Sequence, residues 1–372
     1  MLIGVPKVIK VHEYRVALTP TSVREFVSHG HSVLVETNAG IGIGSSDEVY
    51  QAAGAHIAAT PADIFAKADL IVKVKEPQAA ERQMLRPDQV LFAYLHLAPD
   101  PDQTRDLVNS GAVCIAYETV TDGHGGLPLL APMSQVAGRL SIQAGAAALE
   151  RAKGGRGILL GGVPGVAPAK VVVIGGGMVG ENAIEMALGM GADVTVLDKN
   201  VGVLARLAHR FGAALKTVYS TKASIEDYVL QADLVIGGVL VAGAEAPKLV
   251  NRDLVRRMKS GAVLVDVAID QGGCFETSHP TTHAEPTYVV DGVVHYCVAN
   301  MPGAVPHTST HALNNVTLPY ALALADKGYK SALLDDPNFL AGLNVCKGQI
   351  TYPAVADSLG YQYVDPRVAL DA

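Results

Sequence analysis

The sequence of 372 residues contains only four cysteines, and no two of them form a CxxC pair. They are scattered along the chain at Cys114, Cys274, Cys297 and Cys346. This spacing disfavours both a disulfide framework and a cysteine-based metal site. We therefore expect reduced thiols in a cytoplasmic protein, and no metal ion.

Long hydrophobic runs and clusters of basic residues are also absent from the sequence. Its apolar segments are shorter than the ~18 residues that suggest a membrane-spanning helix, and no signal-peptide pattern follows Met1. The net charge of −7 creates no field that attracts nucleic acids or anionic membranes. We expect small molecules, and neither a nucleic acid nor a membrane, as partners.

The chain does have the length and the pattern of a two-domain α/β protein. Hydrophobic residues make up 49% of it, and strand-like runs alternate with helix-like runs, which favours parallel sheets. The strand candidates are residues 2–5, 32–36, 69–74, 90–95 and 112–117 in the first part, and 170–174, 193–197, 233–241, 262–269 and 293–299 in the second.

A glycine-rich motif directly follows the strand-like segment KVVVI, residues 170–174. Gly175, Gly177 and Gly180 take the three positions of GxGxxG, a helix-like run comes next, and a second strand ends at Asp198. This order is typical of a dinucleotide-binding fold, in which backbone N–H groups at the helix N-terminus meet the pyrophosphate. Asp198 would accept hydrogen bonds from the ribose hydroxyls and repel a 2′-phosphate, so the motif favours NAD over NADP.

The positions expected for further cofactor contacts follow from sheet geometry, because a ligand lies beyond the carboxyl ends of the strands. This rule selects Met178 and Val179 within the motif, and Ser220, Val239, Leu240, Ala268, Asn300 and Met301 after later strands. Asp270 follows the strand 262–269 and would face the nicotinamide. A capping or turn aspartate is the alternative for Asp270.

Polar residues also follow three strands of the first part, namely Lys75, His96 and Glu118. A parallel sheet would gather them along one edge, and Arg15, in the polar turn after the first strand, could reach the same edge. Each residue has an ordinary alternative. His96 could be a satisfied core histidine and Arg15 a surface arginine. Lys75 could pair with Glu76, and Glu118 could be a structural carboxylate.

An arginine, a lysine, a histidine and an aspartate beside a nicotinamide suggest a chemistry. Arginine can hold a carboxylate through two hydrogen bonds, and lysine can polarise a carbonyl group. Histidine can pass a proton near neutral pH. The set suits a small 2-oxo acid and its 2-hydroxy or 2-amino acid partner, and the residues alone do not separate these two reactions.

A long helix-like segment, residues 131–155, separates the two parts, with Ser134 as a plausible N-cap. After residue 305 the chain becomes helical again, with Pro319 in or near the helix, and this tail is too short to fold alone. We therefore expect two Rossmann-like parallel-sheet domains. The substrate domain would comprise residues 1–130 and 306–372, and the NAD-binding domain, residues 131–305, would be inserted between them.

The sequence resembles the alanine dehydrogenase/transhydrogenase alpha-subunit family over nearly its whole length. The segments that carry the resemblance include EYRVALTP (13–20), LIVKVKEP (70–77), LFAYLHLAPD (91–100), DQGGCFE (270–276) and ANMPGAVP (299–306). Of these, VKVKEP and DQGGCFE fit alanine dehydrogenases better than transhydrogenase subunits. The resemblance implies an NAD-dependent enzyme, in a homohexamer, that interconverts L-alanine with pyruvate and ammonium.

The resemblance also implies roles for individual residues. Arg15 and Lys75 would bind the substrate, His96 would be the general acid/base, and Asp270 would assist proton transfer. Ser134, Asp198, Ser220 and Asn300 match positions that contact NAD. Val8, His12 and His307 depart from the family, which commonly has an acidic residue, an asparagine and a basic residue there. Another NAD enzyme of the same architecture and a non-enzymatic NAD sensor are the alternative functions.

Overall fold

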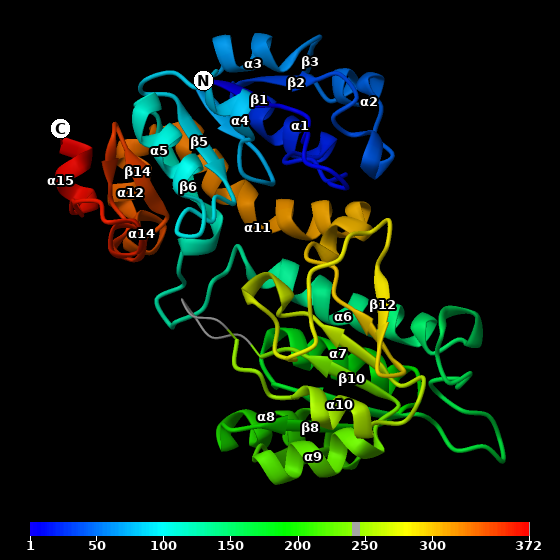
Figure 1. Ribbon diagram of the computed structural model, residues 1–372. Helices are drawn as coiled ribbons and strands as arrows, with labels where there is room; N and C mark the ends of the chain where they lie inside the picture. The colour runs from blue at the N-terminus through cyan, green and yellow to red at the C-terminus, as the bar shows by residue number, and fades with distance from the viewer. Residues whose placement is uncertain (240–245, 372) are drawn as a thin grey trace. The chain divides into compact units, whose positions relative to one another are not determined.

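The computed structural model describes residues 1–239 and 246–371 (Figure 1). The chain divides into two compact units, of which unit 1 is Met1–Met133 with Val305–Ala372 and unit 2 is Ser134–Ala304. In Figure 1 the blue-to-cyan and orange-to-red segments form unit 1, and the green-to-yellow segments form unit 2. Unit 2 is therefore one continuous insertion between two separate parts of unit 1.

The described residues of unit 1 form an eight-stranded sheet in the order β15-β14-β6-β5-β4-β1-β2-β3. Its strands are β1 (Leu2–Val5), β2 (Ser32–Glu36), β3 (His56–Ala58), β4 (Leu70–Val72), β5 (Val90–Ala93), β6 (Val113–Ala116), β14 (Leu343–Cys346) and β15 (Gln349–Ile350). Strands β1 to β6 are parallel, and β14 pairs antiparallel with both β6 and β15. The C-terminal tail thus completes the sheet that the N-terminal part begins.

The helices of unit 1 are α1 (Pro20–Ser28), α2 (Asp47–Ala52), α3 (Pro61–Lys67), α4 (Ala79–Arg82), α5 (Pro101–Ser110), α11 (Pro306–Lys327), α12 (Tyr329–Asp335), α13 (Pro337–Leu340), α14 (Pro353–Leu359) and α15 (Pro366–Asp371). Several begin with a proline in the first turn, where the missing N–H costs nothing. Thr19 also caps α1 by accepting from the Ser22 backbone N–H.

In unit 2, the described residues form a seven-stranded sheet in the order β12-β13-β11-β10-β7-β8-β9. Its strands are β7 (Lys170–Ile174), β8 (Asp193–Asp198), β9 (Leu215–Tyr219), β10 (Leu234–Gly237), β11 (Val263–Asp266), β12 (Thr287–Val290) and β13 (Val293–Tyr296). The helices are α7 (Met178–Gly189), α8 (Val201–Phe211), α9 (Lys222–Gln231) and α10 (Arg252–Arg257). All strand pairs are parallel except β12 with β13.

Both sheets have the strand order of a doubly wound Rossmann fold. In each unit the first parallel strand lies at the centre, the next two extend to one side, and the following three extend to the other. The order reverses between β1 and β4 in unit 1 and between β7 and β10 in unit 2, which makes these the expected ligand positions. The prediction of two Rossmann-like α/β domains is confirmed, with the correction that each sheet carries an antiparallel extension.

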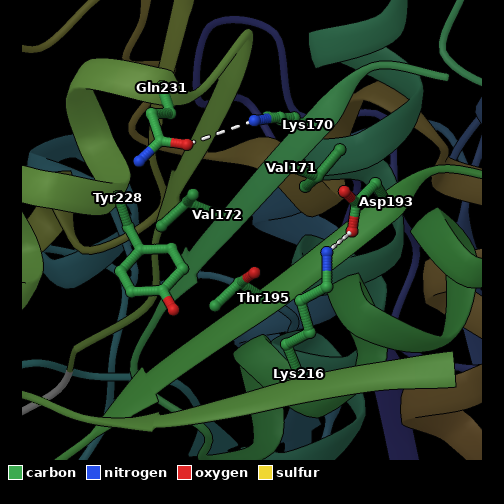
Figure 2. Close-up of a pocket in the computed structure, with 8 residues that line it drawn as sticks. All are labelled: Lys170, Val171, Val172, Asp193, Thr195, Lys216, Tyr228 and Gln231. Carbon is green, nitrogen blue, oxygen red and sulfur yellow. Dashed lines mark hydrogen bonds and ion pairs between the residues drawn. The ribbon is translucent and has the colours of Figure 1, made fainter. Parts of the chain in front are cut away.

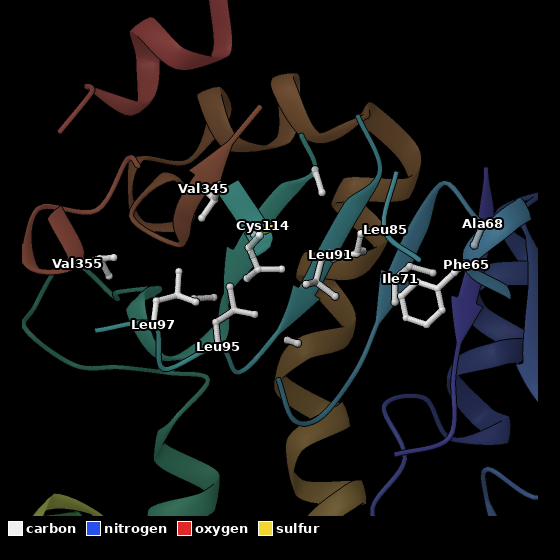
Figure 3. Packing of buried hydrophobic residues seen from close by; sticks show 14 of the residues in the cluster. Phe65, Ala68, Ile71, Leu85, Leu91, Leu95, Leu97, Cys114, Val345 and Val355 are labelled. Atoms are coloured by element: carbon white, nitrogen blue, oxygen red, sulfur yellow. The ribbon is translucent and has the colours of Figure 1, made fainter. Parts of the chain in front are cut away.

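The core of unit 1 explains why its central strands are almost continuously hydrophobic. Strands β5 and β6 are buried at every position, since parallel sheets are covered on both faces. Figure 3 shows Leu91 of β5 and Cys114 of β6 in one cluster with Phe65, Ile71 and the tail residue Val345. Residues more than 200 positions apart in the sequence therefore share one core.

Some local predictions were wrong. Helix α6 (Ala131–Ala148) begins three residues before Ser134, so this residue lies in the first turn and is not the N-cap. Pro132 explains the earlier start, because proline suits the first turn of a helix. Strands β3, β9, β12, β14 and β15 were not among the sequence candidates, and most are short or lie at sheet edges.

The four cysteines are free and buried. No helix of the described residues has the length and hydropathy needed to cross a membrane. Within residues 1–239 and 246–371, no group of three or more histidine, cysteine and acidic side chains has an arrangement that could hold a metal ion.

Asn314 connects the middle of α11 to the start of α1. It is 2% exposed, and its Oδ1 accepts from the Thr19 backbone N–H (2.9 Å), the Thr19 hydroxyl (2.9 Å) and the Ser22 hydroxyl (2.5 Å). Its Nδ2 donates to the Ala17 carbonyl (3.1 Å). One side chain therefore satisfies four groups of the segment that leads from β1 to α1.

Replacing Asn314 by alanine should destabilise the protein by about 2–4 kcal/mol, since each buried polar group left without a partner costs ~1–3 kcal/mol. The free energy of unfolding, measured in urea, checks this. Gln51→Ala on the exposed face of α2 is the control and should change stability by less than ~0.5 kcal/mol. Equal stability of the Asn314→Ala variant and the wild type would contradict the assignment.

Candidate functional site

Four residues predicted from the sequence follow four neighbouring strands of unit 1. Arg15 follows β1, Lys75 follows β4, His96 follows β5 and Glu118 follows β6. Because parallel strands end at the same edge, the topology gathers these residues there, with Arg15 and Lys75 at the reversal of strand order. Electrostatics agrees, because the positive charge of Arg15 contributes to lowering the pKa of Lys75.

Arg15 is 3% exposed and is not a surface arginine. Its guanidinium donates to both oxygens of Glu13, from Nε to Oε1 (2.7 Å) and from Nη2 to Oε2 (2.5 Å). Its Nη1 lies 3.0 Å from the Met133 sulfur. Glu13 was not selected from the sequence, although an acid two residues from a buried arginine is a recognisable signal. The carboxylate fixes the plane of the guanidinium and compensates its charge.

Lys75 lies in the loop between β4 and α4. Burial is the main cause that lowers its pKa, followed by the charge of Arg15. Glu76, the partner that the sequence offered as an alternative, forms its ion pair with Lys10. Two cations at one partly buried edge favour the binding of an anion, because an anionic ligand would compensate both charges.

A buried ion pair connects the two ends of this loop. Lys73 and Glu81 are both about 1% exposed or less, and the Lys73 ammonium donates to Glu81 Oε1 (2.5 Å). Glu81 also accepts from the Gln78 backbone N–H (2.7 Å), so one carboxylate joins the end of β4 to the start of α4. This geometry holds the loop that carries Lys75.

His96 is not a core histidine, because 47% of its side chain is exposed. Its backbone has φ 51°, in the left-handed region that few residues other than glycine adopt. The Tyr94 ring lies nearly parallel to the imidazole, with an interplanar angle of 5° and centroids 5.9 Å apart. A solvent-accessible histidine with a constrained backbone is suited to exchanging protons with a bound ligand.

In unit 2, the glycine-rich motif forms the turn between β7 and α7. Gly175 has φ 98°, which suits glycine, and a Cβ atom on Gly180 would lie 1.8 Å from the Gly175 carbonyl oxygen. A Cβ atom on Gly177, the N-cap of α7, would meet nothing within 4 Å. The open side at Gly177 and the free helix N-terminus fit the pyrophosphate of a dinucleotide. Met178 and Val179 form the first turn of α7.

Asp198 ends β8 beside this turn. Its Oδ2 accepts from the Gly176 backbone N–H and its Oδ1 from the Asn200 N–H, both at 2.7 Å. The Ser220 N–H, after β9, donates to the Asp198 carbonyl (3.0 Å). The acid, the glycine turn and Ser220 are therefore brought together, as the order of β7, β8 and β9 requires.

Asp270 lies in a 3-10 turn, Ile269–Gln271, after β11. The buried Asp266 at the end of β11 holds this loop, because its carboxylate accepts from the Cys274 N–H (3.0 Å), the Phe275 N–H (3.2 Å) and the Ser278 hydroxyl (2.6 Å). Sequence analysis did not select Asp266. Asp266 could have been selected because it is a charged residue within the apolar run VLVDVA.

The remaining cofactor candidates lie after strands of the same sheet. Val239 follows β10, and its side chain would lie 3.1 Å from a Cβ atom on Gly175. Ala268 follows β11, and Asn300 and Met301 follow β13. Ser134 lies in α6, and Leu240 is outside the described residues.

A small pocket lies at the opposite edge of the unit 2 sheet (Figure 2). It is lined by Lys170, Val171, Val172, Asp193, Thr195, Lys216, Tyr228 and Gln231. These residues come from the starts of β7, β8 and β9 and from α9. The glycine turn and Asp198 follow the carboxyl ends of the same strands, so this pocket is separate from the candidate cofactor residues.

Comparison with known proteins assigns the chain to a family. The family described as "Alanine dehydrogenase/PNT, N-terminal domain" matches residues 4–137, and "Alanine dehydrogenase/PNT, C-terminal domain" matches residues 141–353. The chain belongs to the alanine dehydrogenase/PNT family. A curated relative, the alanine dehydrogenase of Halomonas elongata, is 63% identical over 365 residues, which cover 98% of each chain.

Two solved structures resemble this chain over most of its length. One named L-alanine dehydrogenase has a TM-score of 0.94 and 53% identity, covering 97% of this chain and 99% of that one. A transhydrogenase from Sinorhizobium meliloti has a TM-score of 0.82 and 25% identity, covering 95% of this chain and 100% of that one. The first similarity is greater in both sequence and structure.

The three departures from the family are accommodated locally. Val8 is buried, His12 adopts φ 57° with Nδ1 3.0 Å from the Tyr14 hydroxyl, and His307 packs edge-to-face on His311 with centroids 4.5 Å apart. None of the three replaces a candidate catalytic or substrate-binding residue.

Replacing Lys75 by methionine should make the protein more stable at pH 7. Burial and then Arg15 lower the pKa of Lys75 from its ordinary value of 10.5, so the folded protein disfavours the charged form. This cost is fully present below the lowered pKa and disappears as pH rises to the unfolded value. The midpoint of thermal unfolding should therefore rise by a few degrees at pH 7, and the gain should shrink toward pH 10.5.

Thermal unfolding followed by circular dichroism at several pH values measures this gain. Lys67→Met, which removes an exposed lysine of α3, is the matched control and should show no such gain. A Lys75→Met variant that is less stable than the wild type at pH 7 would refute the idea that this charge opposes folding.

Proposed function

We propose that the protein is an NAD-dependent L-alanine dehydrogenase that converts L-alanine, NAD and water reversibly to pyruvate, ammonium and NADH. The observation that carries this proposal is the edge of the unit 1 sheet, where the buried Arg15 and the half-buried Lys75 follow strands that end at the same edge as the strand before the exposed His96. The full-length similarity to alanine dehydrogenases supports it.

Arg15 and Lys75 bind the substrate in this proposal. The guanidinium pairs with the carboxylate of alanine or pyruvate, and the ammonium group binds the carboxylate or the oxo oxygen. Glu13 keeps the guanidinium oriented before the substrate arrives. Orientation of this kind is a large part of what an enzyme contributes to a reaction between two bound molecules.

Unit 2 binds NAD in this proposal, through the glycine turn, Asp198 and the residues that follow its strands. The open space beside Gly177 supports this assignment. Asp198, next to the glycine turn, also supports it, because its carboxylate can accept hydrogen bonds from ribose hydroxyls. When bound, NAD accepts the hydride from the Cα atom of alanine. The remaining contacts are proposed for Ser134, Gly175, Met178, Val179, Gly180, Ser220, Val239, Leu240, Ala268, Asn300 and Met301.

His96 and Asp270 move the protons. In the oxidative direction, His96 accepts the proton that the amino nitrogen loses, and an imino acid forms that Arg15 and Lys75 hold. Water then adds to the imino carbon, Asp270 and His96 transfer protons to the nitrogen, and ammonium leaves. Proton transfer by a positioned side chain typically contributes a factor of about 10²–10⁴.

We also propose that the protein acts as a homohexamer in the cytoplasm, on the basis of the family resemblance. Sedimentation equilibrium of the purified protein is the measurement, and a mass near that of six chains is the expected result. A monomeric mass would contradict the hexamer and leave the proposed reaction untouched.

A transhydrogenase-like activity is the second candidate, favoured by the similarity to the Sinorhizobium meliloti structure. The two functions differ in their need for ammonium and pyruvate. NADH oxidation with pyruvate, measured with and without ammonium and repeated with NADPH, separates them. Oxidation of NADH only when ammonium is present supports the proposal. Equal oxidation without ammonium indicates a 2-hydroxy acid dehydrogenase, and NADH binding without oxidation favours the second candidate or a sensor.

His96→Ala should lower kcat for reductive amination by about 10²–10⁴, because the variant lacks the proposed general acid/base. Affinity for NADH, measured by fluorescence titration, should stay within about twofold. His56→Ala, which removes an exposed histidine of β3, is the control and should keep wild-type activity. Ordinary turnover by the His96→Ala variant would eliminate His96 as the acid/base.

A further inference from the structure

Glu118 occupies an unusual place at the end of β6. It lies in the 3-10 turn Tyr117–Thr119, and its side chain is 14% exposed. The carboxylate accepts two successive backbone amides of the neighbouring segment. His96 N donates to Oε1 (2.6 Å), and Leu95 N lies 3.2 Å from both oxygens. These amides belong to the second and third residues after β5.

The two amide hydrogen bonds hold a backbone conformation that would otherwise be unfavourable. With φ 51°, His96 is in the left-handed region, which is unfavourable for a residue with a Cβ atom. Such conformations persist where the surrounding structure fixes them, and they cluster at functional sites. Hydrogen bonds to a charged acceptor are stronger than those between neutral groups, so the Glu118 carboxylate can stabilise this conformation.

Glu118 also constrains the ring of His96. Its Oε1 lies 3.9 Å from the imidazole Nδ1, which is too long for a hydrogen bond but within ion-pair range. The ring of Tyr94 lies parallel to the imidazole, and the Tyr94 hydroxyl is anchored to the Leu129 carbonyl (2.5 Å). With Nδ1 next to the carboxylate, Nε2 is the ring nitrogen left to exchange a proton with a substrate.

We propose that Glu118 is a positioning residue for the reaction, holding His96 in the left-handed conformation that presents Nε2 to the substrate. This inference rests on the proposed function, because it assumes that His96 carries the proton. Glu118 acts through His96 and does not itself touch the substrate. Removing its carboxylate should slow proton transfer and leave binding of both substrates nearly unchanged.

The experiment compares Glu118→Ala and Glu118→Gln with the wild type in NADH-dependent amination of pyruvate. Glu118→Ala removes both acceptors, so kcat should fall about 10–100-fold, as expected when a catalytic group moves by ~1 Å. KM for pyruvate and the affinity for NADH should stay within about threefold. Glu118→Gln keeps a carbonyl oxygen that can accept from His96 N–H, and it should recover part of the loss.

The solvent deuterium isotope effect on kcat is the decisive readout. If proton transfer becomes slower, this isotope effect should rise above the wild-type value in Glu118→Ala. A merely structural role would reduce the amount of folded enzyme without changing the isotope effect. Asp122→Asn is the matched control, since the Asp122 carboxylate also accepts two backbone amides of unit 1, those of His124 and Gly126, both at 2.8 Å.

Each result has a defined meaning. An unchanged kcat in Glu118→Ala, or a lower kcat with an unchanged isotope effect, overturns the inference. If Glu118→Ala does not fold, Glu118→Gln decides by the same two quantities. A wild-type protein without ammonium-dependent activity removes the proposed function and this inference together. An active wild type with unaffected variants removes the inference alone.

Discussion

The parallel pairing of strands is the constraint on which both candidate regions depend. A parallel ladder makes all strands run in one direction, so every loop that follows a strand leaves from the same edge. In each unit the strand order reverses at the centre of the sheet, so the loops on the two sides of this point lead away in opposite directions. For this reason Arg15 and His96, which are far apart in the sequence, follow strands that end at the same edge of the sheet. No local sequence motif is needed for this arrangement.

Electrostatics at the edge of unit 1 works against stability. Arg15 and Lys75 bring two like charges into a partly buried region, and the pKa of Lys75 is lowered as a result, first by burial and then by Arg15. Glu13 compensates the charge of Arg15 through two hydrogen bonds. This excess of positive charge is what the proposed binding of an anionic substrate would use, because the ligand would compensate the charge that the protein leaves.

The sequence was sufficient to predict what depends on pattern. Buried parallel strands are continuous apolar runs, and the glycine turn has a fixed spacing, so β1, β5 and β7 and the residues after them could be located. Short edge strands such as β3 and β15 have no comparable pattern, because half-exposed segments of two or three residues show no periodicity. The predicted start of α6 was wrong because Pro132 and Ser134 are both residues that are common at the start of a helix.

Side-chain partners could not be predicted in the same way. Asp266, Glu13 and the two amides held by Glu118 are contacts between groups that only the folded backbone brings within hydrogen-bonding distance. Sequence spacing shows which strand a residue follows, but the left-handed φ of His96 and the direction of its ring depend on a neighbouring strand.

The insertion of unit 2 has a consequence for synthesis on the ribosome. Strand β6 must pair with β14, which is made more than 200 residues later, whereas every strand of unit 2 is available as soon as residue 304 has emerged. The inserted unit can therefore fold while the first one still lacks an edge. During this interval the unpaired side of β6 and the apolar surface that Val345 later covers are open to solvent and to other nascent chains. The unit that begins later along the chain can thus be the first to complete its sheet.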